Sequence, residues 1–151
     1  MAREAHGADA LTVYERVAAL LGLKSPVRSE VDLIERLEKG LPAAAVQSLR
    51  DRAGLTDEET YTLIAPRRTL QRRDALRQTL SPEEADRVVR IARITARAQY
   101  VFDAKPAYAA EWLRTPHAAI GGRTAMQALA SESGALAVEE ILIGIEHGMF
   151  D

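Results

Sequence analysis

Cysteine is absent from this chain of 151 residues, and the three histidines, His6, His117 and His147, are scattered. Without thiols the chain can form neither a disulfide nor a thiolate metal site. Three isolated imidazoles do not make a transition-metal site. The sequence therefore predicts no metal and no cofactor.

The sequence also lacks a run of about 18 apolar residues, the length that a membrane-spanning helix needs. Its first 16 residues, MAREAHGADALTVYER, contain acids and no apolar core of a secretory signal. We therefore expect a cytoplasmic protein with no membrane partner.

Alternating strand patterns are missing, and the chain is predicted to be all-α. Thr56 with Glu59, and Ser81 with Glu84, are spaced as capping boxes at helix starts. The longest predicted helix covers residues 82–102. A break follows, so we expect an N-terminal helical unit over residues 1–104 and a smaller helical unit over residues 105–151.

Apolar spacing and glycines predict further details of packing. We expect Val31, Ile34 and Leu37 to face inward from a helix over residues 30–39, with Leu33 as a further candidate. From a later helix we expect Leu70 and Leu76 to face inward. We expect a helix from residue 124 to 133 that glycine 134 ends, and a last helix over residues 135–147.

Charge is unevenly distributed behind a net charge of −2. Residues 61–100 hold nine arginines and four acids, whereas residues 101–151 hold three bases and seven acids. This asymmetry indicates two different partners, or a solvated helix face that arginines decorate.

Two short predicted helices meet at residues 63–66, which suggests a helix-turn-helix over about residues 56–78. The second helix of such a pair places polar side chains in the major groove, where arginine pairs with guanine and glutamine with adenine. The candidate DNA-binding residues are Arg67, Arg68, Thr69, Gln71, Arg72 and Arg73.

The chain ends IEHGMFD, a helix stop followed by two large apolar residues and an acid. Before it stands WLRTPHAAIGGRTAMQAL, with the only tryptophan, Trp112, an anchor for a core or an interface. The glycine pair at 121–122 lacks the spacing and lysine of a P-loop. It predicts a tight turn that leads to Thr124 as a helix cap.

These C-terminal residues closely resemble the toxin-binding domain of the Xre/MbcA/ParS antitoxins, partners of RES-domain toxins. The upstream stretch RRTLQRR…LSPEEADRVVRIARI resembles the Xre-like DNA-binding half of the same family, so the resemblance covers about residues 55–148. The sequence departs from the pattern at Ala125, where proline is frequent. The matching positions are Trp112, Leu113, Pro116, Ile120, Gly121, Gly122, Thr124, Leu129, Gly134, Val138, Leu142, Ile145, Glu146, His147 and Gly148.

The resemblance implies a type II antitoxin without catalytic activity. Its C-terminal domain would cover the NAD-binding site of a RES toxin that degrades NAD or transfers ADP-ribose. Its N-terminal domain would bind the promoter of its own operon, in a 2:2 or larger complex formed through antitoxin dimerisation. The expected toxin-binding residues are Trp112, Arg123, Glu139, Leu142, Glu146, His147, Met149, Phe150 and Asp151.

Two other functions fit parts of the sequence. A helix-turn-helix repressor whose C-terminal block only dimerises or senses a ligand would use the same arginines. An enzyme with Glu146 and His147 as acid and base is disfavoured, because neighbours on a helix point about 100° apart and no nucleophile accompanies them.

Overall fold

The computed structural model describes residues 12–102 and 105–148, which form nine α-helices, a 3-10 helix and a two-stranded sheet. The N-terminal elements are α2 (Val13–Leu21), α3 (Glu30–Lys39), α4 (Ala44–Ala53), α5 (Asp57–Leu63), α6 (Arg67–Ala75) and α7 (Pro82–Val101). The C-terminal elements are α8 (Pro106–Leu113), β1 (Pro116–His117), η1 (Ala118–Ile120), β2 (Arg123–Thr124), α9 (Ala125–Ala128) and α10 (Glu132–Glu146). The all-α prediction is confirmed. None of these helices is long and apolar enough to cross a membrane.

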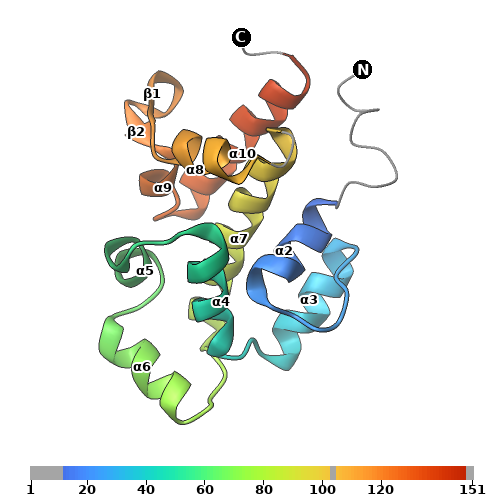
Figure 1. Cartoon of the computed structure of the whole chain (residues 1–151), viewed down its shortest axis with the longest axis vertical. Coiled ribbons are helices and arrows are strands. Elements are labelled where there is room, and N and C mark those ends of the chain that lie inside the picture. Colours follow the sequence, from blue (N-terminus) through green and yellow to red (C-terminus); the bar gives the residue numbers. More distant parts are fainter. Residues whose placement is uncertain (1–11, 103–104, 149–151) are drawn as a thin grey trace.

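Helix α7 runs through the middle of the molecule and is shared by both ends (Figure 1). It packs against α2, α3 and α4 on one side and against α8 and α10 on the other. The stripe formed by Val88, Ile91, Ala92, Thr95 and Ala98 is buried, and Ile94 and Ala96 outside it are also buried, whereas Phe102 at its end is only partly buried. Because α7 is covered on several faces, the N-terminal and C-terminal elements pack on one common core.

The predicted capping boxes are confirmed. At α5, the backbone N–H of Thr56 donates to Glu59 Oε1 at 3.0 Å, and Glu59 N–H donates to Thr56 Oγ1 at 3.0 Å. At α7, Ser81 and Glu84 exchange the same bonds at 2.9 and 3.2 Å. These bonds satisfy N–H groups that a helix start otherwise leaves unpaired.

Two predicted inward faces are only partly right: Leu37 packs against the core and Leu70 is buried, but Val31, Ile34 and Leu76 are not. On α3 the buried residue is Leu33, whereas Val31 and Ile34 are 60% and 50% exposed, because α3 turns only its Leu33 and Leu37 side toward the core. Leu76 is 61% exposed because α6 ends at Ala75. After the turn, Leu80 returns to the core instead, and its N–H donates to the Leu41 carbonyl at 2.8 Å.

The predicted role of Gly134 as a helix stop is also wrong. Helix α9 has only four residues, and α10 already begins at Glu132 with Ser131 as its cap. Gly134 lies inside the first turn of α10, where its N–H donates to Ser131 Oγ at 3.0 Å. A Cβ at this position would lie 1.9 Å from the carbonyl oxygen of Ala128. Glycine is therefore required here by the close approach of α9, not by a left-handed backbone.

Arg77, in the turn after α6, has φ +53° and is the only non-glycine residue with positive φ in the described part of the chain. This conformation brings Cβ close to a carbonyl oxygen and costs about 1–2 kcal/mol for residues other than glycine. Glycine would remove this cost but would also make the unfolded chain more flexible, which favours unfolding.

We therefore expect Arg77→Gly to raise the free energy of unfolding by a net amount of about 0.5–1 kcal/mol. Urea denaturation measures this free energy. Gln78→Gly, next in the chain, should lower stability, and an equal gain in both variants would contradict the explanation.

Candidate functional site

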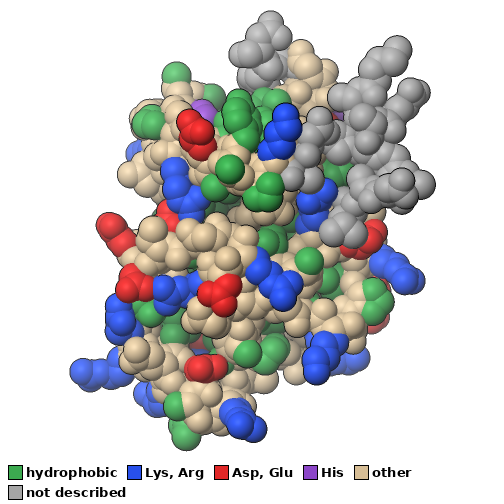
Figure 2. All heavy atoms as spheres, in the orientation of Figure 1, with side chains coloured by type: hydrophobic (Ala, Val, Ile, Leu, Met, Phe, Trp, Pro, Cys, Tyr) green, Lys and Arg blue, Asp and Glu red, His purple; other side chains and the backbone are tan. Residues whose placement is uncertain are grey.

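The pair α5–α6 has the arrangement of a helix-turn-helix. Helix α5 ends at Leu63 and α6 begins at Arg67 after Pro66. Arg87 of α7 donates to the Ile64 carbonyl at 3.0 Å and so holds the turn. Helix α6 lies at the end of the molecule farthest from the β1–β2 hairpin (Figure 1). Basic side chains project from this end (Figure 2).

The six candidate DNA-binding residues do not all face solvent. Arg67, Arg68, Gln71 and Arg72 are exposed, whereas Thr69 and Arg73 are half-buried. Arg73 Nε lies 2.6 Å from Glu84 Oε1. Partial burial acts to raise the pKa of Glu84, but hydrogen bonds from Ser81 and from Arg73 outweigh it and hold that pKa below its ordinary value. Arg73 therefore fixes the α6–α7 junction.

Arg67 is positioned by α5. Its Nη2 lies 3.0 Å from Asp57 Oδ2, and its guanidinium carbon lies 4.7 Å from the ring centre of Tyr61. Asp57 also accepts a hydrogen bond from Arg50, and the two guanidinium groups hold the pKa of this carboxyl below its ordinary value. Within the described residues, Arg68 and Arg72 have no ion-pair partner and are available for an anionic ligand.

The C-terminal elements present a small, preformed hairpin. Pro116 pairs with Thr124 and His117 with Arg123, and Gly122 N–H donates to the His117 carbonyl at 2.9 Å. His117 Nε2 donates to the Trp112 carbonyl at 3.0 Å, and the two rings lie 4.3 Å apart. The glycine turn that the sequence predicts is therefore part of a hairpin anchored on Trp112.

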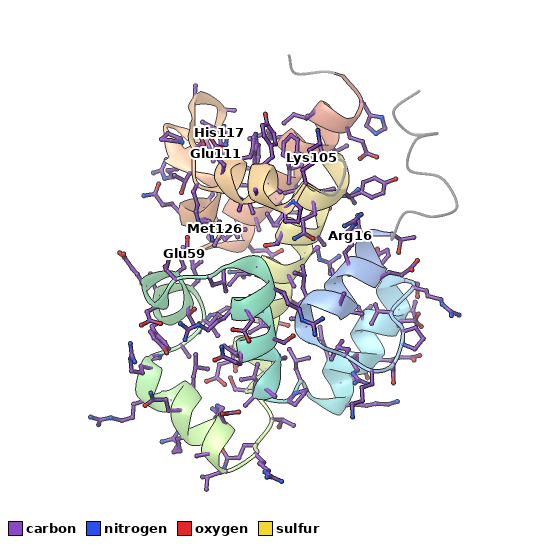
Figure 3. All side chains as sticks on the ribbon, viewed as in Figure 1. Arg16, Glu59, Lys105, Glu111, His117 and Met126 are labelled. Carbon is purple, nitrogen blue, oxygen red and sulfur yellow. The ribbon has the colours of Figure 1, made fainter. Side chains whose placement is uncertain are left out.

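Trp112 belongs to an aromatic cluster that the sequence analysis missed. Its ring centre lies 5.7 Å from that of Phe102, the residue that caps the end of α7, and the Phe102 ring centre lies 4.9 Å from that of Tyr108 of α8. Tyr108 is 54% exposed. In Figure 3, His117 and Glu111 lie together at this end of the molecule. The cluster joins residues from α7, α8 and β1, and no single spacing in the sequence reveals it.

The remaining toxin-binding candidates differ in how far their side chains are exposed to solvent. Leu142 has no exposed surface, so its assignment to the toxin-binding surface is wrong, because it is a core residue. Glu139 is half-buried, and His147 and Arg123 are exposed. Glu146 lies 3.6 Å from Arg97 and its side chain is only 12% exposed. Met149, Phe150 and Asp151 lie outside the residues that the structure describes.

The charge asymmetry of the sequence is partly neutralised inside the fold. Arg90 pairs with Glu132 at 3.1 Å, and Arg97 faces Glu146, so arginines of α7 are matched by acids of α10. Arg93, between them, makes a bidentate pair with Glu30 of α3 at 2.8 Å. The interpretation of the whole asymmetry as a sign of two external partners is therefore too broad. For α6, where exposed arginines remain, an external partner and a solvated helix face both stay open as predictions.

A helix-turn-helix unit joined to a second helical unit with an exposed hairpin defines a class of small regulatory DNA-binding proteins. Residues 32–93 match the family described as "Antitoxin Xre-like helix-turn-helix domain", and residues 97–148 match "Antitoxin Xre/MbcA/ParS C-terminal toxin-binding domain". The chain belongs to the Xre family of antitoxins, and is a regulatory protein rather than an enzyme.

Three relatives support this assignment. Antitoxin Xre of Pseudomonas putida is 36% identical over 133 residues, which are 88% of this chain and 82% of the relative. Antitoxin Xre of Yersinia enterocolitica is 29% identical over 119 residues, 78% of this chain and 80% of the relative. Antitoxin Xre of Photorhabdus laumondii is 27% identical over 114 residues, 75% of this chain and 77% of the relative. They support a type II antitoxin that binds a toxin through one unit and carries a DNA-binding helix-turn-helix in the other.

Proposed function

We propose that this antitoxin neutralises a RES-family toxin, an enzyme that consumes NAD or transfers ADP-ribose, by covering its NAD-binding site with residues 105–151. The observation that carries the proposal is the match of residues 97–148 to a toxin-binding domain. The division of the chain at residues 104 and 105 remains part of this proposal. So does its place of action in the cytoplasm, where the operon DNA lies.

The toxin-facing surface that we propose combines the hairpin end and the end of α10. It includes Trp112, Arg123, Glu139, Glu146 and His147, followed by the tail residues Met149, Phe150 and Asp151. A pocket for a dinucleotide has to attract pyrophosphate and is therefore electropositive, which favours an acidic partner surface. Glu146 adds little to this field, because it faces Arg97 and its side chain is only 12% exposed. The apolar pair Met149–Phe150 would supply the anchors.

The second proposed activity is binding to the promoter of its own operon through α6. The reading residues would be Arg68, Gln71 and Arg72, with Arg67 held in place by Asp57. Thr69 and Arg73 are less accessible, and Arg73 would act through the α6–α7 junction. One helix-turn-helix unit binds DNA weakly, so specific binding favours a dimer.

A 2:2 or larger complex through antitoxin dimerisation remains our expectation. The exposed apolar residues Val31 and Ile34 on α3, 60% and 50% exposed, are suitable for such an association. Exposed aliphatic side chains that lie one turn apart on a helix form a strip that a second copy can cover.

The proposed toxin inhibition is tested with the RES toxin that we propose as the cognate partner, by following NAD consumption in vitro. The full chain should abolish the activity at equimolar concentration. A chain ending at Gly148 lacks Met149, Phe150 and Asp151 but keeps the Glu146–Arg97 pair, and it should inhibit at least tenfold more weakly, as expected for loss of anchor residues. Promoter binding should be unchanged.

Inhibition of NAD consumption by the full chain also distinguishes an antitoxin from a repressor that does not bind a toxin. A repressor whose C-terminal block only dimerises or senses a ligand would leave NAD consumption unaffected by the full chain. A matched control is Leu76→Ser on the opposite end of the molecule, which should inhibit like the unmodified chain.

A further inference from the structure

Arg114, the residue that ends α8, connects the C-terminal elements to the helix-turn-helix. Its Nε and Nη2 each donate to Glu59 of α5, at 2.9 Å. Nη2 also donates to the Gly54 carbonyl at 3.3 Å, and Nη1 to the carbonyl of Ala110 in its own helix at 3.0 Å. The side chains of Arg114 and Glu59 are 30% and 17% exposed, so the pair is partly shielded from water.

The acceptor of this bond already has a structural role. Glu59 is the third residue of α5, and its Oε1 caps the helix by accepting the N–H of Thr56. Gly54, the other acceptor, is the left-handed residue that ends α4. One guanidinium group therefore holds both the end of α4 and the start of α5. Bidentate arginine–carboxylate pairs fix orientation as well as distance.

Helix α5 needs such support because it has only seven residues, and isolated helices of this length are not stable in water. Its outer face is not tightly covered by the C-terminal elements. A groove of about 300 Å³ lies between α5 and α9, lined on one side by Glu58, Thr62 and Leu63 and on the other by Thr124, Met126 and Gln127. Glu59 and Met126 both line this groove, and Figure 3 shows that they lie near each other. Among the described residues, Arg114 forms hydrogen bonds across this groove to α5.

We propose that Arg114 is a positioning residue for DNA binding. It holds α5, and through the turn at residues 64–66 also α6, although it belongs to the C-terminal toxin-binding domain and lies far along the chain from α6. The inference rests on the proposed reading of DNA by α6. It makes the C-terminal elements part of the DNA-binding machinery without any contact between them and DNA.

The test uses the full chain and a labelled DNA fragment from upstream of its own operon, with binding measured at several salt concentrations. Arg114→Gln and Glu59→Gln should each weaken binding about fivefold to twentyfold, a range usual for coupling between sites. The slope of log Kd against log salt should stay that of the unmodified chain, because neither residue contacts phosphate. The double variant should be no weaker than either single variant. Arg114→Lys, which keeps the charge but not the bidentate geometry, should lose part of the affinity.

The control is Lys105→Gln, since Lys105 is an exposed basic residue in the same half and belongs to neither proposed binding surface. It should bind DNA normally. Three results would overturn the proposal. One is unchanged DNA affinity of Arg114→Gln. The others are a slope of log Kd against log salt reduced by about one, as for a lost phosphate contact, and losses of affinity that add up in the double variant.

Hydrogen exchange provides a second readout that does not depend on DNA. The amides of α5 and α6 should exchange faster in Arg114→Gln while those in the middle of α7 do not. Unchanged protection would refute the role of Arg114, whereas faster exchange in a chain that never binds DNA would refute only the reading by α6.

Discussion

Gly134→Ala should destabilise the protein by about 3 kcal/mol or more, the upper end of what an added methyl group costs in a tightly packed site. In most helices the same change is stabilising by about 1 kcal/mol. Here the new Cβ would lie 1.9 Å from the Ala128 carbonyl oxygen and 2.8 Å from its carbon. These are backbone atoms at the end of α9, which cannot move without shifting the helix. Thermal or urea denaturation followed by circular dichroism measures the change.

A matched control separates the steric clash from backbone conformation. Gly54 has φ +70° and no atom within 4 Å of an added Cβ. Gly54→Ala should therefore cost only about 1 kcal/mol, from the left-handed conformation alone. A Gly134→Ala variant as stable as the unmodified chain would show that α9 and α10 can separate at no cost.

Replacement of Arg67, Arg68 and Arg72 by glutamine should weaken promoter binding at least about 100-fold at moderate salt, and reduce the slope of log Kd against log salt by about 2–3. The three residues are exposed on α6, and each is expected to contact phosphate or a base edge. Arg73 is kept because it pairs with Glu84 at 2.6 Å, so its loss would change the structure as well as the surface charge. Fluorescence anisotropy over a series of salt concentrations gives both quantities.

The control for this variant removes three positive charges elsewhere. Lys24, Arg28 and Lys105 are exposed and lie outside α5 and α6. Their replacement by glutamine changes the net charge equally and should weaken binding only slightly. Equal losses in the two triple variants would mean that net charge, and not α6, determines binding.

The sequence predicted those parts of the fold that depend on neighbours along the chain. The caps at Thr56 and Ser81 were predictable because donor and acceptor are three residues apart. Gly134 was misread because a glycine near a helix end has the same local signal whether it stops the helix or admits another backbone. Only the position of Ala128 in space decides between the two.

The candidate site was less predictable, because its residues come together in space from distant parts of the chain. The motif that contains Trp112 indicated the C-terminal surface, yet the aromatic cluster joins three separate elements. Glu146 pairs with Arg97 of α7, far away in sequence, so its partly internal role could not be inferred from the acidic tail. The burial of Leu142 shows that a position which matches a binding motif can be required for packing and not for contact.

The common core on α7 has a consequence for how the cell can remove this protein. Small domains with one core unfold cooperatively, with few stable intermediates. The buried stripe of α7 contacts α2 and α10 at once, so loss of either covering helix exposes apolar surface needed by the other. A protease that pulls on the chain from either end would therefore unfold the toxin-binding unit and the helix-turn-helix in the same event.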